Sequence, residues 1–377
     1  MSNETMLAFA IPNPGDTFGR VMRVKKPAPE KDHALIRVLR AGVCNTDIEI
    51  LQGYMGFHGV LGHEFVGIVE KVNGNETQQQ EWLGKRVCGD INVGCAECSI
   101  CTNAHHLDEK CSQMSRNHCP NRSVLGILKR NGAMAEYLTL PLSNLHVVDD
   151  HISDEVAVFA EPLAAACRIP EQGLIQYEGG RPDRVAILGD GKLGLMIAEV
   201  LGREHFARVS DSDKHPVPVL FGKHEQKLRL VKASGVDCRL VSECIDKSSF
   251  NGVASAHAGK YDVVVDATGS PAGLTLAAGL CRPMGTLILK SSCAAGEKFN
   301  AAPFVIDEIT VVGSRCGPID KALELLAIKE TGADGGRHPL HVEKYITKAF
   351  LLSEAEEAIE CAAEKSTMKI QIICSEK

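Results

Sequence analysis

The sequence lacks the features that mark several large classes of protein. No apolar run approaches the roughly 20 residues that span a membrane, and the first residues, MSNETMLAFAIPNPG, have no basic start followed by a long apolar core. No run of lysine and arginine forms a stripe that could follow a phosphate backbone. We therefore expect no membrane and no nucleic acid as partners. We expect a cytoplasmic protein, with an organelle as the alternative location.

Aromatic residues are also scarce, at 5% with a single tryptophan, whereas the hydrophobic share of 44% and the charged share of 24% are those of a soluble globular protein. The 377 residues are too many for one ordinary domain and enough for two. The net charge of -7 is mild, so a small anionic cofactor could still bind at a local site. Fifteen cysteines in a long chain without a signal peptide indicate reduced thiols and metal rather than disulfides.

The stretch CAECSIC places Cys95, Cys98 and Cys101 with two residues between each pair. Short side chains at this spacing can converge on one ion, and zinc prefers four such thiolates in a structural site. Cys111 and Cys119 are the candidates for the fourth ligand. Weaker candidates are His105, His106 and His118. The alternatives are free thiols on a loop or an iron-sulfur cluster.

A second set of candidate ligands is dispersed along the first half of the chain. His63 and Glu64 stand side by side in GVLGHEFVG, Cys44 lies upstream in AGVCNTD, and Glu161 lies downstream in FAEPLA. Thiolate, imidazole and carboxylate together are typical of a catalytic zinc that keeps one position open for water or substrate. Each residue alone is more often an ordinary core residue.

The segment RVAILGDGKLGLMIAEVLG predicts a nucleotide-binding turn. An apolar strand, Val185 to Leu188, precedes three glycines in the pattern G-x-G-x-x-G, and a helical stretch comes after them. The glycines permit a tight turn and let a pyrophosphate approach the helix N-terminus. The alternative is a plain strand-to-helix turn. The cofactor-binding residues that we expect are Gly189, Gly191, Lys192, Leu193, Gly194, Gly222, Lys223, His224 and Thr268.

Two registers are possible for the strand that selects between NAD and NADP. Counting about 20 residues from the glycines leads to VSDSDK, where Asp211 or Asp213 would bond the ribose of NAD. Counting back from the helical stretch EQKLRLVKASGVD instead places the strand at VPVLF, followed by Gly222, Lys223 and His224. We prefer VPVLF because it is the more apolar strand. A cationic pair without an acid suits a 2′-phosphate, so we expect NADP, with NAD as the alternative.

Further apolar strands, YDVVVDATG around Asp266 and GTLILKSS around Leu289, alternate with helical stretches such as AGLTLAAGL and complete a doubly wound parallel sheet. GVCNTD, GHEFVG, the cysteine lobe, AEPLA and the glycine pattern, in this order, resemble the zinc-containing medium-chain dehydrogenases, the alcohol and polyol dehydrogenase family. The resemblance covers essentially the whole chain. It implies an α/β fold with a GroES-like, partly open β-barrel catalytic domain (1–157), a Rossmann nucleotide domain (158–314) and a C-terminal return to the catalytic domain (315–377).

The resemblance also implies roles for individual residues. Cys44 and His63 match the catalytic zinc ligands, and Glu64 matches a glutamate that binds directly or through water. Glu161 replaces a cysteine, as in the sorbitol and glucose dehydrogenase branch. Cys119 matches the fourth ligand of the structural zinc, because HCPNRSVLG resembles the segment that relatives carry at that cysteine.

The remaining implied roles concern the substrate. Thr46 matches a hydroxyl residue that passes the substrate proton outward, and Glu49 stands where many relatives carry the histidine that ends this relay. Arg315 resembles an arginine of the polyol pocket; its alternative is a surface cation. We therefore expect hydride transfer between NADP and an alcohol, aldehyde, sugar or polyol, in a homo-oligomer that is a dimer or tetramer.

Three other functions are alternatives. They are an NAD-dependent polyol dehydrogenase, a zinc-free quinone reductase, against which the intact ligand set argues, and a non-catalytic zinc and nucleotide-binding protein of the same fold.

Overall fold

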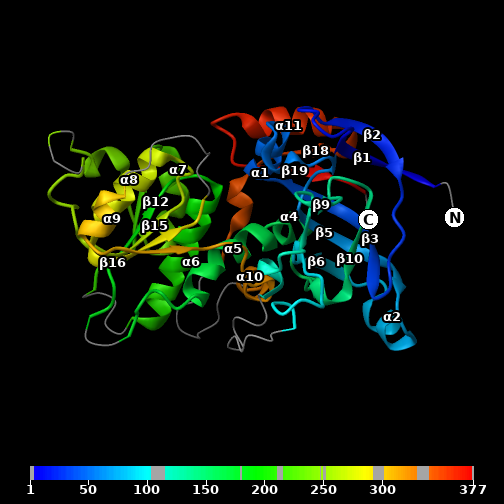
Figure 1. The fold of residues 1–377 in the computed structure, drawn as a ribbon, viewed down its shortest axis with the longest axis horizontal. Helices are drawn as coiled ribbons and strands as arrows, with labels where there is room; N and C mark the ends of the chain where they lie inside the picture. Colours follow the sequence, from blue (N-terminus) through cyan, green and yellow to red (C-terminus); the bar gives the residue numbers. More distant parts are fainter. Residues whose placement is uncertain are drawn as a thin grey trace. The chain divides into compact units, whose positions relative to one another are not determined.

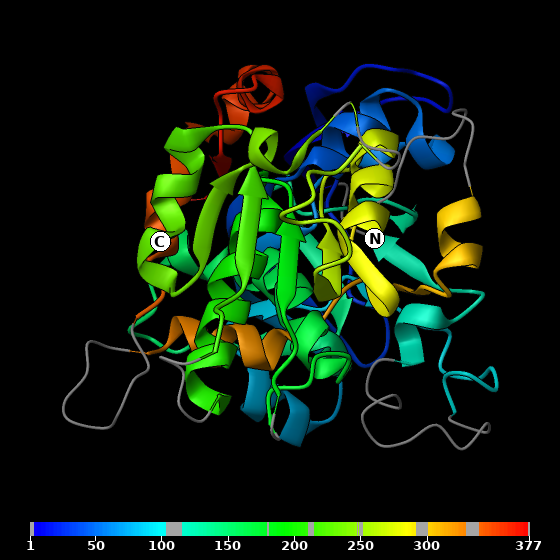
Figure 2. The same cartoon turned by 90° about the vertical axis from the view of Figure 1, so that its left-hand side faces the viewer.

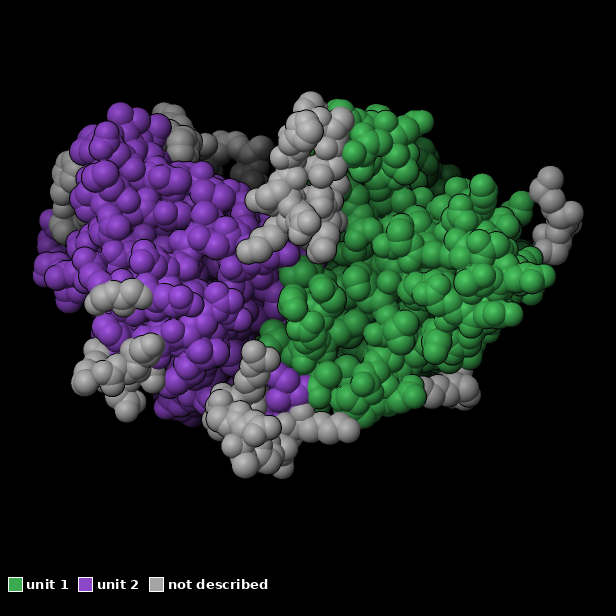
Figure 3. Space-filling view, turned by 90° about the horizontal axis from the view of Figure 1, so that it is seen from below, with its two compact units in different colours: residues 1–161, 318–327, 341–377 green, residues 162–317, 328–340 purple. Residues whose placement is uncertain are grey.

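The computed structural model describes residues 4–102, 115–178, 181–209, 215–246, 248, 252–291, 301–328 and 339–375. The chain forms two compact units (Figure 1 and Figure 3). Unit 1 comprises Met1–Glu161, Pro318–Ala327 and His341–Lys377, and unit 2 comprises Pro162–Gly317 and Ile328–Leu340. Residues 328–340 thus belong to unit 2, whereas the sequence places all of 315–377 with the catalytic domain. The domain limits expected from the sequence remain predictions.

Unit 1 is built on a seven-stranded sheet in the order β11-β6-β5-β3-β19-β18, with β10 also paired to β3. Two three-stranded sheets, β2-β1-β4 and β7-β8-β9, complete its strands. The strands are β1 (Thr5–Ile11), β2 (Arg20–Lys25), β3 (His33–Val43), β4 (Gly59–Val60), β5 (Glu64–Asn73), β6 (Arg86–Gly89), β7 (Asn92–Val93), β8 (Ser123–Leu125), β9 (Lys129–Arg130), β10 (Tyr137–Pro141), β11 (Leu145–Val147), β18 (Ile346–Leu351) and β19 (Lys369–Ile373). The helices are α1 (Asn45–Leu51), α2 (Glu76–Trp82), α4 (Asp154–Ala157), α5 (Ala160–Glu171), which continues into unit 2, α10 (Ile319–Leu326) and α11 (Ala355–Ala363).

The register of the central strands brings three distant segments to one end of this sheet. In the antiparallel β3–β5 pair Gly42 faces Glu64, and in the antiparallel β3–β19 pair Val43 faces Ile370. A side chain at position 42 would collide with its neighbour, because an added Cβ would stand 2.1 Å from Glu64 Oε2. The glycine therefore leaves room for the Glu64 carboxylate beside the C-terminal strand.

Unit 2 contains a six-stranded, all-parallel sheet in the order β14-β13-β12-β15-β16-β17, and Figure 2 shows its arrows side by side. This is the 3-2-1-4-5-6 order of a doubly wound nucleotide-binding fold. The strands are β12 (Val185–Leu188), β13 (Val219–Gly222), β14 (Asp237–Leu240), β15 (Tyr261–Asp266), β16 (Cys281–Leu289) and β17 (Thr310–Gly313). The helices are α6 (Lys192–Arg208), α7 (Glu225–Leu228), α8 (Pro271–Leu280) and α9 (Ala302–Ile306).

Burial explains why these strands appear as continuous apolar runs. Every residue of β12, β13 and β15 is buried, as expected for a parallel sheet that is covered on both faces. The strands predicted at VAIL, VPVLF, YDVVVD and GTLIL are confirmed, as is the helix at AGLTLAAGL. The alternative strand at ARVSD is wrong at its start, because Ala207 and Arg208 end α6. Asp211 and Asp213 lie outside the described residues.

Candidate active site and nucleotide site

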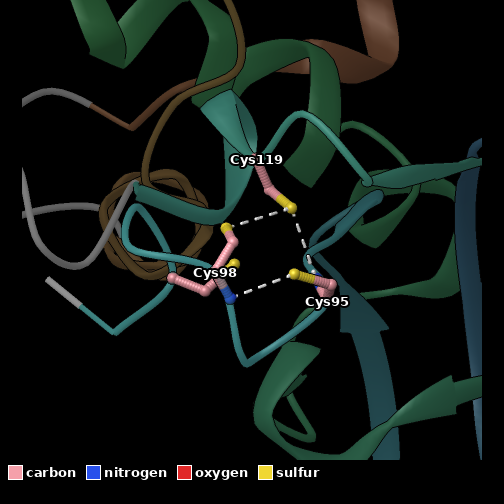
Figure 4. A group of neighbouring side chains, drawn as sticks. Cys95, Cys98 and Cys119 are labelled. Carbon is pink, nitrogen blue, oxygen red and sulfur yellow. Dashed lines mark hydrogen bonds between the residues drawn. The ribbon is translucent and has the colours of Figure 1, made fainter.

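Four cysteines of the lobe after β7 lie close together, and Figure 4 labels three of them, Cys95, Cys98 and Cys119. The sulfurs of Cys95, Cys98, Cys101 and Cys119 all lie within 4.8 Å of one another. The Cys98 thiol donates to Cys119 Sγ across 3.7 Å. Four sulfurs around a tetrahedral zinc at about 2.3 Å would be separated by about 3.8 Å. The arrangement therefore fits a structural zinc, while Cys111, His105 and His106 lie outside the described residues.

The backbone of the lobe favours the thiolate form of one ligand, Cys95. The backbone N–H groups of Glu97 and Cys98 lower the pKa of the Cys95 thiol to about 6. The Cys95 N–H in turn donates to Cys119 Sγ (3.4 Å), whose side chain is fully buried. Thiolate is the form that binds zinc, so this hydrogen bonding favours the ligand state.

We expect Cys119→Ser to release the lobe metal. Loss of one of four thiolates should lower the zinc content by about one ion per chain and lower the melting temperature. Zinc content is measured by elemental analysis and melting by calorimetry. Cys361→Ser, a change at a free half-buried thiol on α11, is the matched control. Unchanged zinc content in the Cys119 variant would contradict this prediction.

The second cluster stands at the sheet end described above. Cys44 caps the N-terminus of α1, His63 precedes β5, and Glu64 begins it. One ligand atom from each of the three lies within 4.8 Å of the others. His63 and Glu64 are 3% and 1% exposed, so these polar groups are held inside the unit. Glu161, in the first turn of α5, is not a member of this group within the described residues.

Asp47 is a site residue that the sequence reasoning missed. It is fully buried, and its Oδ2 accepts from the Cys44 N–H (2.8 Å). Its Oδ1 accepts from the Gly62 N–H (3.2 Å) and lies 3.5 Å from His63 Nδ1. One carboxylate thus orients both candidate ligands, as outer groups of metal sites do. The signal in the sequence was the capping pattern, in which an acid three residues after the cap residue accepts its N–H.

The same carboxylate affects the protonation of His63. Burial alone would lower the pKa of His63, but Asp47 and Cys44 outweigh it and raise that pKa well above the ordinary value. A zinc ion bound through His63 must displace this proton, so its affinity should depend on pH.

We expect Asp47→Asn to weaken metal binding at this cluster about 10- to 100-fold, because the amide no longer orients Cys44 and His63 as a carboxylate does. Competition with a zinc chelator measures the affinity. Glu81→Gln, on the exposed end of α2, is the control. Equal zinc affinity in both variants would show that Asp47 does not support the site.

A buried lysine, Lys369, lies beside Glu64. Lys369 Nζ lies 2.7 Å from Glu64 Oε1 and also contacts Oε2, and both side chains are at most 2% exposed. Burial would lower the pKa of Lys369, but Glu64, with further contributions from Cys44 and Glu161, raises it. The ammonium therefore neutralises the carboxylate beside His63. No local sequence pattern predicts this contact, because Lys369 lies 305 residues from Glu64 in the chain.

The other predicted substrate-side residues are dispersed. Thr46 lies beside the cluster, where its Oγ1 accepts from the Cys44 thiol across 3.8 Å. Glu49 lies on the same helix with its side chain largely exposed, and partial desolvation of the carboxylate raises its pKa. Arg315 belongs to unit 2, where it is exposed and its carbonyl accepts from Lys290 Nζ.

The glycine turn of unit 2 has the geometry of a phosphate cradle. Gly189 has φ +112, and an added Cβ would meet Ala267 O at 2.7 Å. Gly194 packs so closely on the turn that an added Cβ would stand 1.9 Å from Gly189 O. Gly191 caps α6 and faces open space, with no atom within 4 Å of an added Cβ. Space in front of a helix N-terminus suits a pyrophosphate, so the residues fit a dinucleotide.

The remaining predicted cofactor residues surround this turn. Lys192 and Leu193 begin α6 and are partly exposed. β13 ends at Gly222, followed by the exposed Lys223 and by His224. After β15, the Thr268 hydroxyl donates to Asp266 Oδ1 (2.7 Å), which fixes the loop beside the glycine turn. A second residue missed from the sequence, Asp190, contacts His224.

Comparisons with known proteins agree with this geometry. The alcohol dehydrogenase GroES-like domain matches residues 30–150, and the zinc-binding dehydrogenase domain matches residues 217–331. The D-arabitol-phosphate dehydrogenase of Enterococcus avium is 26% identical over 98% of both chains. The erythritol/L-threitol dehydrogenase of Mycolicibacterium smegmatis is 27% identical over 99% of both. A zinc-binding dehydrogenase structure from Sinorhizobium meliloti, bound to NADP, is 25% identical with a TM-score of 0.75, over 98% of this chain and 99% of that one.

The two matched domains together cover more than half of the chain, and the fold and both ligand clusters are those of a zinc-dependent, nucleotide-binding oxidoreductase. The chain belongs to the zinc-containing medium-chain dehydrogenases, the alcohol and polyol dehydrogenase family. It is an alcohol or polyol oxidoreductase that uses zinc and NAD or NADP. The predicted combination of a GroES-like domain with a Rossmann domain is confirmed. None of the helices within the described ranges could cross a membrane.

Proposed function

We propose that this dehydrogenase interconverts a polyol and the corresponding carbonyl compound with NADP as the hydride carrier. The observation that carries the proposal is the Cys44–His63–Glu64 cluster with the Thr46 hydroxyl beside it. Glu161 lies in the first turn of α5 and contributes to the raised pKa of Lys369, the partner of Glu64, so we propose Glu161 as the third ligand. Cys44, His63 and Glu161 would hold the catalytic zinc. Glu64 would remain outside this ligand set, because Lys369 binds both of its oxygens.

When bound, zinc supplies Lewis acidity to a substrate oxygen and the nicotinamide ring carries a hydride. The chain contributes proton movement and orientation. Thr46 Oγ1 can accept a proton from a substrate hydroxyl and pass it outward. Glu49 can receive it, since partial desolvation raises the pKa of its carboxyl group. Asp47 keeps Cys44 and His63 in place during this transfer.

The proposed substrate class draws support from the relatives. They are named for D-arabitol phosphate and for erythritol or L-threitol, and others for D-altritol and sorbitol. Because one of them is named for a phosphorylated polyol, polyol phosphates belong among the candidates.

The proposed use of NADP is supported by the end of β13. That strand carries no acid at its end, and Lys223 comes directly after it, so a 2′-phosphate would meet a cation there. The structure from Sinorhizobium meliloti holds NADP.

We also propose a cytoplasmic homo-oligomer, either dimer or tetramer. β17 is one of the two edge strands of the unit 2 sheet, and Val311 on it is 44% exposed. An apolar edge strand can pair with a second copy.

The test is a substrate screen with zinc-loaded protein. Simple alcohols, polyols, aldoses and polyol phosphates are mixed with NADP or NAD, and absorbance of the reduced nicotinamide is followed. We expect the fastest reduction with a polyol or its phosphate and NADP, and loss of the rate after chelation with recovery on adding zinc. Faster reaction with NAD would assign the other cofactor. No substrate-dependent change with zinc bound would favour a non-catalytic binding protein.

A further inference from the structure

Asp190, the middle residue of the Gly189–Asp190–Gly191 turn, reaches across to the neighbouring strand. Its side chain is only 10% exposed. Oδ2 accepts from the His224 backbone N–H (2.6 Å) and lies 3.0 Å from His224 Nδ1. The turn that cradles the phosphates is therefore tied to the segment after β13.

Asp190 fills the space that a side chain at Gly222 would need. A Cβ added to Gly222 would stand 2.7 Å from Asp190 Cβ and 2.8 Å from Leu228 Cδ2. The last residue of this strand is where dinucleotide-binding folds usually carry the acid that bonds the adenosine ribose. In this chain Gly222 occupies that position, so no acid stands there. The carboxylate of Asp190, from the glycine turn, lies next to it.

The contact determines which ring nitrogen of His224 faces outward. An ionised carboxylate can only accept hydrogen bonds, so Nδ1 must be the donor in this pair. Nε2 is then the nitrogen left for a ligand, and the side chain of His224 is 53% exposed. Lys223, the preceding residue, is exposed as well.

We propose that Asp190 is a positioning residue for cofactor choice: it holds His224 so that Nε2, together with the Lys223 ammonium, meets the 2′-phosphate of NADP. The inference rests on the proposed use of NADP. A bare carboxylate at this place would repel that phosphate. Here two N–H groups of one residue engage Oδ2 and offset part of its charge.

The test compares NADPH and NADH binding to the wild type, Asp190→Ala and Asp190→Asn by nicotinamide fluorescence. In the alanine variant we expect the Kd for NADPH to rise about tenfold, since loss of one ionic hydrogen bond has this size. The Kd for NADH should change less than about twofold, because it lacks the phosphate. Asp190→Asn should recover part of the loss, because its amide oxygen can accept from the His224 N–H. Glu225→Gln, at the start of α7, is the matched control.

Three outcomes would overturn the inference. Tighter NADPH binding in either variant would mean that Asp190 acts by repulsion. Weaker NADH binding alone would make it a ribose ligand, and equal weakening of both cofactors would make its role purely structural. The wild type tests the proposed function separately: a preference for NADH would contradict the use of NADP, whereas the role of Asp190 is judged by the change in the ratio of the two Kd values between variant and wild type.

Discussion

The variants Cys44→Ala and His63→Ala should lose turnover by about a thousandfold or more while they bind nicotinamide cofactor as the wild type does. Removing either ligand opens the cluster and releases zinc, and a metal that acts as a Lewis acid contributes several kcal/mol to the transition state. Nucleotide binding should persist because the glycine turn lies in unit 2, whereas both ligands lie in unit 1. The measurements are turnover, zinc content and cofactor titration on the same preparations.

Controls for these variants come from the same unit. Cys361→Ala removes a half-buried thiol of α11 and His33→Ala removes an imidazole at the start of β3, and neither residue is part of a ligand cluster among the described residues. Both should retain zinc and turnover. Full turnover in the Cys44 or His63 variant would disprove the assignment of this cluster as the catalytic metal site.

Replacement of Lys369 by methionine should lower the free energy of unfolding by about 3–5 kcal/mol, the usual effect of leaving one charge of a buried pair uncompensated. Methionine fills a similar volume, so the loss would report on the charge of Glu64 rather than on a cavity. The double variant Lys369→Met with Glu64→Gln should recover much of the stability, because neither member of the buried pair is then charged. Urea unfolding of the wild type and the two variants, followed by circular dichroism, measures the effect.

The sign of the pH dependence comes from the raised pKa of Lys369. A lysine whose pKa is higher in the folded chain contributes stability below its ordinary value of about 10.4 and loses it as the pH rises through the folded value. The difference in the free energy of unfolding between the wild type and Lys369→Met should therefore be constant from about pH 6 to pH 9. Lys348→Met, on the exposed side of β18, is the control and should cost less than about 1 kcal/mol. A similar small loss for both lysines would show that the buried pair does not stabilise unit 1.

The sequence by itself determined the features that depend on neighbours along the chain. The strand Val185–Leu188 and its glycine turn could be predicted because a tight backbone turn requires glycine. The zinc lobe could be predicted because ligands as short as Cys95, Cys98 and Cys101 must lie close together in the sequence to reach one ion. The second strand of the nucleotide sheet could also be located, because VPVLF is apolar enough to be buried on both faces.

Only the tertiary structure decided which distant polar groups meet. Lys369 reaches Glu64 because β19 pairs with β3 and β3 with β5, and no spacing in the sequence encodes that register. From the sequence, the absence of a side chain at Gly222 indicated room for a 2′-phosphate. In the structure Asp190 lies next to Gly222, because the adjacent parallel strands β12 and β13 end side by side. Interactions of this kind depend on strand pairing across the whole chain, so they could not be predicted from local residue patterns.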